Sequence, residues 1–219
     1  YALRLKNHEE RMNSQSGGAS YSFGEHILKE DGIVYGCFYD GLNVAHTRIE
    51  NIEQLHRTQG SKYVQSQLGQ CYNQVLADLR KSKKVLFTGT PCQCAGLLTF
   101  LASTNVDISN LITCEFICHG VPSPQVYRDY LAFMENKHGS LILNINLRDK
   151  KAVGWQRHLE SITFADGKKY IGRIYVDLFY SNLTLRRSCE QCRFTKVERV
   201  ADITVADCWG IEKSRPELW

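Results

Sequence analysis

Short hydrophobic runs alternate with amphipathic stretches over the first 140 residues. The runs are rich in β-branched and aromatic residues, which is typical of buried strands, whereas apolar positions spaced three or four apart indicate helices. The predicted strands cover residues 32–39, 43–48, 85–87 and 111–118. The predicted helices cover residues 16–29, 65–81, a segment beginning near Cys92, and 123–138.

The remaining third of the chain has a different pattern. Strands are predicted at residues 141–147 and 159–164, and Asp166-Gly167 is a turn that leads into a hairpin partner. A helix over 177–186, a cysteine-containing loop and a last strand over 202–209 follow. The pattern predicts an α/β fold, a mixed β-sheet flanked by helices, in a single compact domain with a hairpin extension.

Composition narrows the class of protein. With 219 residues, 43% hydrophobic and 23% charged, the chain resembles an ordinary globular protein. The net charge of +4 is too small to indicate nucleic-acid binding, but it is compatible with an anionic cofactor such as a flavin diphosphate. No apolar run approaches the ~20 residues of a membrane span, and no leader pattern opens the chain, so we expect a cytoplasmic protein.

Nine cysteines are the most unusual feature of the composition. An odd number does not suit a framework built only of disulfides, and the cytosol keeps thiols reduced. Metal or redox chemistry is therefore expected for some of them, while others serve as small core residues.

The pair Cys189-x-x-Cys192 is the strongest local signal. Two intervening residues allow one turn to direct both sulfurs toward the same metal ion or cluster. Neighbouring cations would favour thiolates and offset the negative charge of a cluster; these are Arg186, Arg187, Arg193 and Lys196. A redox-active disulfide and a purely structural pair are the alternatives.

The spacing of the other cysteines limits which of them can join Cys189 and Cys192 at one site. Cys114 and Cys118 are four residues apart on one strand, so about 13 Å separates them, and only Cys118, at the strand end, is free to face a site. Cys92 and Cys94 point to different sides of a helix, and Cys92 lies nearer its N-terminus, where the helix dipole stabilises a thiolate.

The remaining candidates receive structural or secondary roles. We expect Cys37 in mid-strand and Cys71 in mid-helix to be structural, and Cys208 to be a reserve ligand. His119 could replace a cysteine at a zinc site, although a local hydrogen bond is its simpler role. The ligand set that remains is Cys92, Cys118, Cys189 and Cys192. Four thiolates suit either zinc or iron–sulfur, and their scatter over three elements favours a cluster.

Two segments could approach a phosphate through backbone N–H groups. Ser16-Gly17-Gly18 opens a helix, and Thr88-Gly89-Thr90 lies between a buried strand and a helix. Each could equally be an ordinary helix cap, and neither has the glycine spacing of a Rossmann dinucleotide motif. Lys62 could bind a phosphate or the pyrimidine edge of a flavin and Tyr63 could stack, or both could simply lie in a solvated loop.

The order of these motifs resembles one family. The chain is similar to the beta subunit of coenzyme F-420 (8-hydroxy-5-deazaflavin) hydrogenases and dehydrogenases, to which plant reductases such as 7-hydroxymethyl chlorophyll a reductase are related. The likeness runs from about residue 12 to the C-terminus. It rests on Ser16-Gly17-Gly18, Gly32-Ile33-Val34-Tyr35-Gly36, Ser61-Lys62-Tyr63-Val64-Gln65-Ser66, Thr88-Gly89-Thr90-Pro91-Cys92-Gln93, Ile117-Cys118-His119-Gly120-Val121-Pro122-Ser123, Gly154-Trp155, Cys189-x-x-Cys192 and Ala201-Asp202-Ile203-Thr204.

The resemblance implies FAD and one 4Fe–4S cluster on the four cysteines named above. It implies that FAD lies near Ser16, Gly17, Gly18, Ser61, Lys62, Tyr63, Ser66, Thr88, Gly89 and Thr90. The segments Cys118-His119-Gly120 and Asp207-Cys208-Trp209 resemble the bacterial branch and not the methanogen hydrogenase subunits. Many members of that branch carry a ferredoxin-like double cluster ahead of this region. We therefore expect residues 1–219 to be the FAD- and cluster-binding core of a protein shortened at both ends.

The predicted function is that of an FAD-dependent iron–sulfur oxidoreductase. Electrons would pass between a ferredoxin-like carrier, fused or separate, and a small organic acceptor, without nucleic acid and without a membrane span. No general acid is assigned, and Lys62, His119 and Asp207 are the candidates. The alternative is a non-catalytic module with a structural zinc site, which docks partners through the basic run around residues 186–199.

Overall fold

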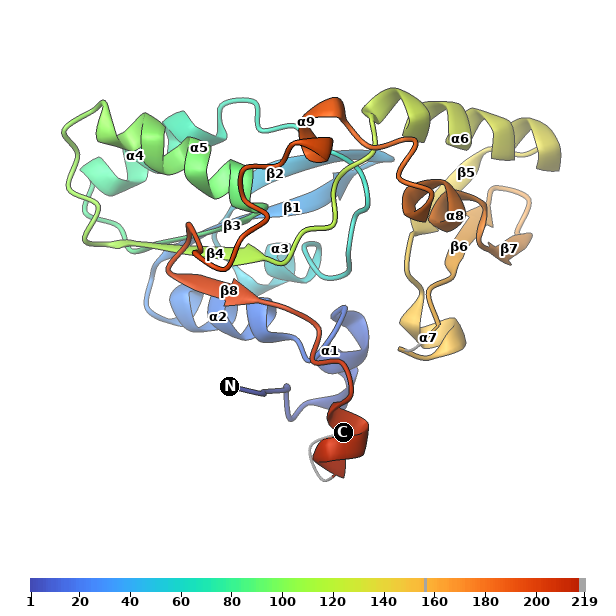
Figure 1. Ribbon diagram of the computed structural model, residues 1–219, viewed down its shortest axis with the longest axis horizontal. Helices are drawn as coiled ribbons and strands as arrows, with labels where there is room; N and C mark the ends of the chain where they lie inside the picture. Colours follow the sequence, from blue (N-terminus) through green and yellow to red (C-terminus); the bar gives the residue numbers. More distant parts are fainter. Residues whose placement is uncertain (156, 217–219) are drawn as a thin grey trace.

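Two β-sheets form the framework of the computed structural model, which describes residues 1–155 and 157–216 (Figure 1). The larger sheet has the strand order β2-β1-β3-β4-β8. Its hairpin strands β1 and β2 are antiparallel, while β1, β3, β4 and β8 run parallel. The strands are β1 (Ile33–Asp40), β2 (Asn43–Ile49), β3 (Val85–Gly89), β4 (Leu111–Phe116) and β8 (Ile203–Val205).

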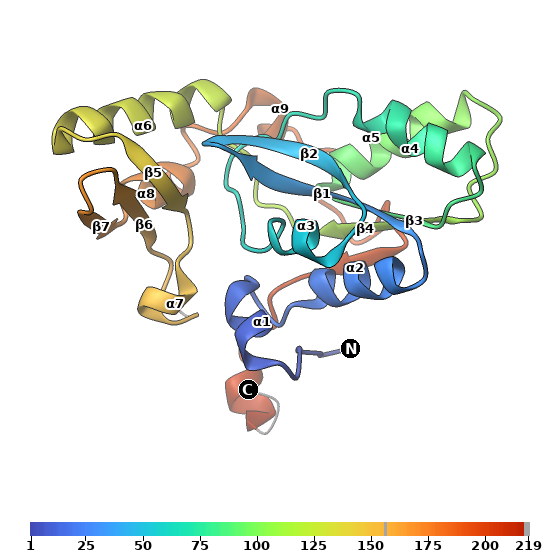
Figure 2. The ribbon, with the colours of Figure 1, turned by 180° about the vertical axis from the view of Figure 1, so that it is seen from behind.

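Helices cover both faces of this sheet, as Figures 1 and 2 show from opposite sides. Helices α4 (Cys71–Arg80) and α5 (Pro91–Ala102) lie on one face, and α2 (Ala19–Lys29) and α3 (Ile52–His56) lie on the other. Successive strand residues point to opposite faces. Tyr35 and Phe87 therefore pack beneath α4 and α5, while Val34 and Leu86 pack beneath α2. Both faces of the sheet are buried at β1 and β3, which explains why these strands contain continuous apolar runs.

The smaller sheet is the hairpin extension. Its antiparallel strands β5 (Ile142–Asn146), β6 (Glu160–Phe164) and β7 (Lys169–Gly172) pack against α6 (Pro124–His138) and α8 (Ile174–Tyr180). The core between them also contains Val44 and Val64 from the larger sheet and its loop, so one continuous core joins the two sheets. This arrangement confirms the predicted fold class.

Several predicted elements have different bounds. The helix expected over 65–81 begins only at Cys71, because residues 65–67 run beside β2: the Gln67 N–H donates to the Val44 carbonyl at 2.9 Å, and Gln67 accepts from the His46 N–H at 2.9 Å. The helix expected from residue 16 begins at Ala19, because Gly18 adopts a left-handed φ of 86° as its N-cap. The prediction missed the pairing of residues 65–67 because it involves a segment outside the expected helix.

The C-terminal elements also differ from the prediction. The helix expected over 177–186 is α8, which ends at Tyr180, and the strand expected over 202–209 is reduced to β8. The strand expected over 111–118 ends at Phe116. The sequence pattern did not predict the short helices α1 (His8–Asn13), α3, α7 (Lys150–Val153), α9 (Arg187–Glu190) and α10 (Ile211–Ser214). Within the described ranges, no helix is both long and apolar enough to span a membrane.

A buried carboxylate links the larger sheet to α4. Asp78 accepts a hydrogen bond from the Tyr35 hydroxyl at 2.6 Å, and Arg48 binds both of its oxygens at 2.6 and 3.0 Å. Burial raises the pKa of Asp78, but the hydrogen bonds from Arg48 and Tyr35 outweigh burial and leave the pKa below its usual value. The pair therefore stabilises the fold above the unfolded pKa of about 3.9, and this contribution is lost as pH falls through the lower folded value.

Replacing Asp78 by alanine is expected to lower the free energy of unfolding by about 3 kcal/mol at pH 7, because the buried Tyr35 hydroxyl loses its acceptor and Arg48 is left with its ion pair to Glu50. Denaturant titration measures the change. Asp40→Ala, at an exposed carboxylate at the end of β1, is the matched control and should change stability by no more than about 0.5 kcal/mol. Equal losses in the two variants would contradict the role assigned to Asp78.

Candidate functional site

Three cysteine-bearing segments leave the same edge of the larger sheet. Cys92 follows β3, Cys118 follows β4, and Cys208 follows β8. These strands are parallel, so their carboxyl ends meet at one edge, which is where α/β sheets usually bind ligands. The Ile117 N–H donates to the Val205 carbonyl at 3.0 Å and keeps the loops after β4 and β8 together.

The Cys189–Cys192 turn reaches this edge because the chain before it pairs with the loop after Cys118. The Ser123 N–H donates to the Thr184 carbonyl at 3.2 Å, and the Arg186 N–H donates to the Val121 carbonyl at 3.0 Å. Residues 185–186, predicted to be helical, are therefore extended here, and α9 follows them beside the chain that leads from β4 to α6 (Figure 1).

The chain after the turn is held from the other side. The Arg199 guanidinium binds the fully buried Glu115 carboxylate, which also accepts from the Thr204 hydroxyl at 3.1 Å. Arg199 donates as well to the carbonyls of Phe194 at 3.3 Å and Lys196 at 3.0 Å. The segment that follows Cys192 is thus bound to β4, three residues before Cys118.

Four free thiols come together as a result. Burial raises the pKa of the Cys118 thiol to about 11, the Gly120 N–H acts in the opposite direction, and the nearby Cys92, Cys189 and Cys192 each raise it further. Cys118 and Cys189 are half-buried, while Cys92 and Cys192 are exposed. These are the four cysteines selected from the sequence, and they lie within electrostatic range of Cys118.

The other thiols mostly belong to the hydrophobic core. Cys71, Cys94 and Cys114 are buried, and burial raises the pKa of these thiols to about 12, 12 and 11. Cys37 is half-buried, and burial raises its pKa as well. Cys71 opens α4 and does not lie in mid-helix as predicted, since the helix begins there.

No group of three or more His, Cys, Asp or Glu side chains could hold a single metal ion, as far as residues 1–155 and 157–216 are concerned. Cys118 and the three cysteines that affect it therefore do not form a one-ion site. Near Cys92, the Thr90 hydroxyl lies 3.1 Å from the sulfur.

Two parts of the predicted flavin site are joined by hydrogen bonds. Gln93, in the first turn of α5, accepts from the Thr90 N–H at 3.0 Å and donates to the Ser66 hydroxyl at 2.8 Å. The Ser66 hydroxyl lies 2.8 Å from Nδ1 of His46, whose Nε2 lies 3.0 Å from the Thr88 carbonyl. The structure thus brings Ser66 together with Thr88 and Thr90.

The two hydrogen bonds of the His46 ring determine which of its nitrogens carries the proton. The Thr88 carbonyl can only accept, so Nε2 carries the proton, and Nδ1 accepts from Ser66. Burial lowers the pKa of His46 to about 4, although its bond to the Thr88 carbonyl acts against this change. His46 is therefore neutral at pH 7. The sequence prediction missed it, and the signal available was a histidine within a predicted strand.

The His46 site predicts a pH dependence. Because the folded pKa lies below the unfolded value near 6.5, the unfolded chain binds more protons between pH 4 and 6.5, and stability should fall by up to about 3 kcal/mol as pH decreases across that range. Denaturant titrations of the wild type and His46→Gln across this range measure the difference, and the variant should show the shallower slope. His8→Gln, at an exposed position, should keep the wild-type slope; identical slopes in all three proteins would contradict the assignment.

The Ser16-Gly17-Gly18 segment is crossed by the N-terminal stretch of the chain. The Leu5 N–H donates to the Gly17 carbonyl at 2.8 Å, and a Cβ on Gly17 would lie 2.5 Å from the Leu3 carbonyl oxygen. These glycines therefore have a packing role that accounts for their small size, independently of any ligand.

Lys62 and Tyr63 are engaged within the protein. The Lys62 amine donates to the carbonyls of Thr58, Gln59 and Gly60 at 2.8–3.1 Å, and burial lowers its pKa to about 8. The Tyr63 ring packs against His158 and Phe179, with centroids 4.8 and 4.9 Å apart. Ser61 lies half-buried in the same loop.

The other candidate acids are also bonded. His119 is exposed and lies 2.7 Å from Asn182 Oδ1, which agrees with the local hydrogen bond expected from the sequence. Asp207 accepts from Arg148 Nη1 at 3.2 Å. The sequence prediction missed Arg148, which comes from the end of the smaller sheet and carries no recognisable motif.

A sequence model that describes the C-terminal part of the beta subunit of coenzyme F420 hydrogenase/dehydrogenase matches residues 82–218, which is 137 of the 219 residues. A search of the curated proteins found no match.

Among solved structures, the chain is similar to one in the xenon-derivatised F420-reducing nickel–iron hydrogenase complex from Methanosarcina barkeri. The TM-score is 0.64, and the sequence identity is 17% over 95% of this chain and 71% of that chain. At this identity the likeness shows a shared fold. The matched family model, in contrast, covers more than half of the sequence. The chain therefore belongs to the beta-subunit family of coenzyme F420 hydrogenases and dehydrogenases, which are oxidoreductases.

Proposed function

We propose that the chain is an iron–sulfur flavoprotein that moves electrons between ferredoxin-type carriers and an organic acceptor through a 4Fe–4S cluster and FAD. The observation that carries the proposal is the gathering of Cys92, Cys189 and Cys192 around Cys118. When bound, the cluster supplies one-electron transfer and the flavin exchanges one or two electrons, so the two groups together would couple one- and two-electron partners.

The donor set fits a cluster better than a zinc ion. All four side chains are thiols, none is in a disulfide, and they come from three separate parts of the chain. A single zinc ion needs its sulfurs about 2.3 Å from one point, and no one-ion group occurs among the described side chains. A cubane distributes its irons over several corners and so suits thiols that are near one another without touching. Exposed Arg186, Arg187 and Arg193 would offset the charge of a thiolate-ligated cluster.

The proposed flavin site lies on the side of the thiols where β3 passes into α5. Thr88, Gly89 and Thr90 lie at the end of β3 and directly after it, immediately before the helix that begins with Pro91 and Cys92. Ser66 is held beside them through Gln93. In this proposal, the helix N-terminus and the two hydroxyls orient the cofactor, while Ser16, Gly17, Gly18 and Ser61–Lys62–Tyr63 form the second contact region.

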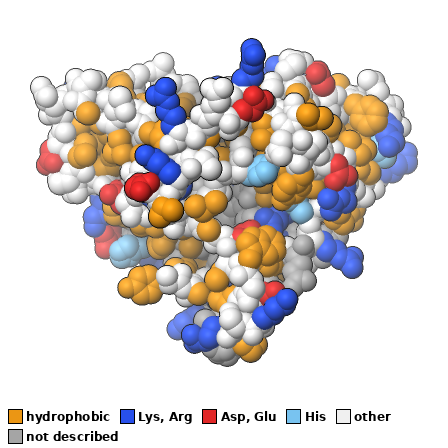
Figure 3. All heavy atoms as spheres, in the orientation of Figure 1, with side chains coloured by type: hydrophobic (Ala, Val, Ile, Leu, Met, Phe, Trp, Pro, Cys, Tyr) orange, Lys and Arg blue, Asp and Glu red, His pale blue; other side chains and the backbone are white. Residues whose placement is uncertain are grey.

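The surface next to the thiols suits an electron carrier. Ile117, Leu183 and Val197 are 58%, 90% and 91% exposed and come from segments that flank the cysteines. Figure 3 shows the face that carries α8, α9 and β8, on which hydrophobic and basic side chains lie beside one another. Such a mixture supports transient docking of an acidic partner close to the proposed cluster.

Anaerobic purification followed by iron, sulfide and flavin analysis tests the proposal. About four irons, about four sulfides and one FAD per chain are expected, with a visible band that bleaches on reduction. One zinc without iron or flavin would contradict the proposal and favour a non-catalytic docking module. Coenzyme F420 is named in the description of the matched family, so it is the first acceptor to assay in the loaded protein.

A further inference from the structure

A small cavity lies between α1, the Gly60 loop and the turn from β5 into α7. Residues 12–15, Gly60 and parts of the 146–151 turn line its wall, and its volume is about 140 Å³. Pockets for drug-sized ligands usually measure roughly 300–1,000 Å³, so this cavity suits a single small group and not a whole dinucleotide. None of the residues that line it is one of the cysteines or hydroxyl residues of the proposed cofactor site.

Two cations are buried in the wall. The exposed fractions of Arg148 and Lys150 are 8% and 7%, and Lys151 lies exposed at the rim. Among the described residues, the Lys150 amine donates to two backbone carbonyls, those of Arg11 and of Ser16, the latter at 3.2 Å. Arg148 has one carboxylate partner, Asp207, at 3.2 Å. No Asp or Glu lines the cavity, so its described wall carries an excess of positive charge.

Two buried donors in this wall have no partner among the described residues. They are Nε of Arg148 and Nε2 of Gln15. A buried N–H without an acceptor costs about 1–3 kcal/mol, more when the group is charged, so such atoms usually mark an absent water, ion or ligand. Nε and Nη2 of a guanidinium together form the planar fork that binds phosphate or carboxylate.

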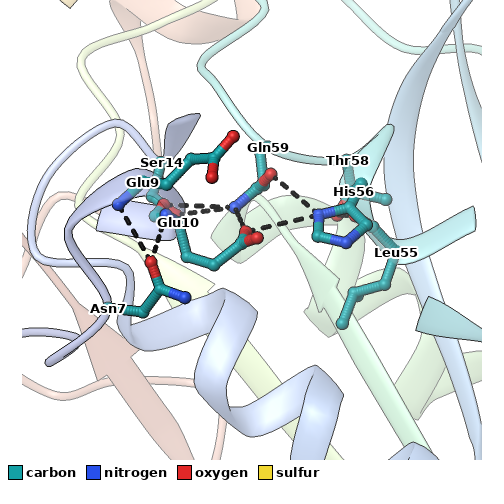
Figure 4. Close-up of polar contacts among 8 residues, drawn as sticks. All are labelled: Asn7, Glu9, Glu10, Ser14, Leu55, His56, Thr58 and Gln59. Atoms are coloured by element: carbon teal, nitrogen blue, oxygen red, sulfur yellow. Dashed lines mark hydrogen bonds and ion pairs between the residues drawn. The ribbon is translucent and has the colours of Figure 1, made fainter. Parts of the chain in front are cut away.

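The rim of the cavity is held in place by a polar network, shown in Figure 4. Gln59 Nε2 donates to Glu10 Oε2 at 3.0 Å and to the Ser14 hydroxyl at 3.2 Å, which joins the Gly60 loop to the end of α1. Asn7 caps α1 by accepting from the Glu9 and Glu10 N–H groups at 2.9 and 3.2 Å. The wall formed by residues 12–15 is therefore preorganised.

The charged form of the buried Lys150 amine would be stabilised by a bound anion. Burial, together with the nearby Arg11 and Arg148, lowers the pKa of Lys150 to about 8, and Asp207 only partly opposes this. A bound anion would relieve the repulsion between the two buried cations and would accept from the unpartnered Arg148 Nε. The unpartnered Arg148 Nε and the lowered pKa of Lys150 both favour a bound anion.

We propose that this cavity is an anion site that binds a phosphoryl group, with Arg148 and Lys150 as its cations and Gln15 as a neutral donor. The inference does not require flavin to be bound. The phosphoryl group belongs either to the diphosphate of a dinucleotide such as FAD, whose remaining parts would lie outside the cavity, or to a separate phosphorylated ligand.

Calorimetric titration of the flavin-free chain with inorganic pyrophosphate tests the site. Lys150→Gln and Arg148→Lys should each weaken binding on the order of tenfold or more, because each removes a charge-assisted hydrogen bond in a desolvated site. Lys151→Gln is the matched control, since it removes one charge at the exposed rim, and it should weaken binding by less than about threefold.

Folding is measured separately by circular dichroism and thermal unfolding. In addition, pyrophosphate should raise the melting temperature of the wild type and of Lys151→Gln, but not that of Lys150→Gln. This comparison remains informative if Lys150→Gln is less stable, because the shift is measured within each protein.

A second titration identifies the source of the phosphoryl group. If it belongs to FAD, Lys150→Gln should weaken FAD binding but not riboflavin binding, and FAD should displace pyrophosphate from the wild type. If it belongs to a separate ligand, FAD-loaded protein should still bind pyrophosphate. Absence of pyrophosphate binding to the folded wild type, or equal weakening by Lys150→Gln and Lys151→Gln, would overturn the proposal. Neither result would affect the iron and sulfide content, which tests the proposed function.

Discussion

Replacing Cys189 by serine is expected to prevent assembly of the proposed iron–sulfur cluster. Cys189 is half-buried in the turn that the 184–186 segment holds near Cys118, so its loss would leave the proposed cluster with three thiol ligands. Iron content should fall from about four per chain to below about one, and the visible band of the cluster should disappear. Iron and sulfide assays on anaerobically purified protein measure both.

Cys208→Ser is the matched control for this experiment. Cys208 is exposed, follows β8 and lies at the same edge of the sheet, but it was assigned only as a reserve ligand. This variant should keep its full iron content. A Cys189→Ser protein with four irons, or a Cys208→Ser protein without iron, would contradict the proposed ligand set.

Replacing Glu160 by alanine should cause the largest loss of stability, about 4 kcal/mol. This fully buried carboxylate accepts from the Tyr130 hydroxyl at 2.8 Å and from the N–H groups of Tyr175 and Val176 at 3.1 and 3.0 Å. It thereby caps α8 and joins α6, α8 and β6. Its removal leaves three buried donors without an acceptor and opens a cavity in their place. Denaturant titration or thermal unfolding measures the loss.

Two further variants are compared with Glu160→Ala in their free energy of unfolding. Glu160→Gln keeps the volume and one acceptor oxygen, so we expect a smaller loss of about 2 kcal/mol. Glu53→Ala, at an exposed position in the first turn of α3, should change stability by about 0.5 kcal/mol or less. If Glu160→Ala were no less stable than Glu53→Ala, the proposed role of the buried carboxylate would be wrong.

Local pattern was sufficient to predict most of the larger sheet. β1 and β3 begin with buried apolar runs, and β3 leads into a helix with a clear start signal, Thr90-Pro91 at α5. The errors occur where the chain makes contacts with distant segments. Residues 65–67 pair beside β2, and residues 184–186 pair with 121–123, which composition alone does not reveal.

The choice of cysteines was possible because it depended on local geometry. Cys114 and Cys94 face the core, whereas Cys118 and Cys92 lie where a strand ends and a helix begins. How the Cys189–Cys192 turn reaches them was not predictable, since it depends on pairing across some sixty residues and on the buried Arg199–Glu115 pair. Their ligation of a cluster remains a prediction.

The two buried cations of the small cavity could not be predicted from the sequence. Arg148 and Lys150 belong to no motif, and a basic residue near a turn usually lies in solvent. Only the docking of the β5–α7 turn against α1 and the Gly60 loop buries them. Similarly, the glycines at 17 and 18 indicated a phosphate site, whereas the structure also gives them a role in packing against residues 3–5.

The most direct test of the proposed cluster is an anomalous difference map, recorded at the iron absorption edge from anaerobically grown crystals. We predict one strong peak enclosed by the sulfurs of Cys92, Cys118, Cys189 and Cys192, at the carboxyl edge of the parallel strands. A peak at the zinc edge alone, or an iron peak bound by Cys208 in place of one of these four, would contradict it.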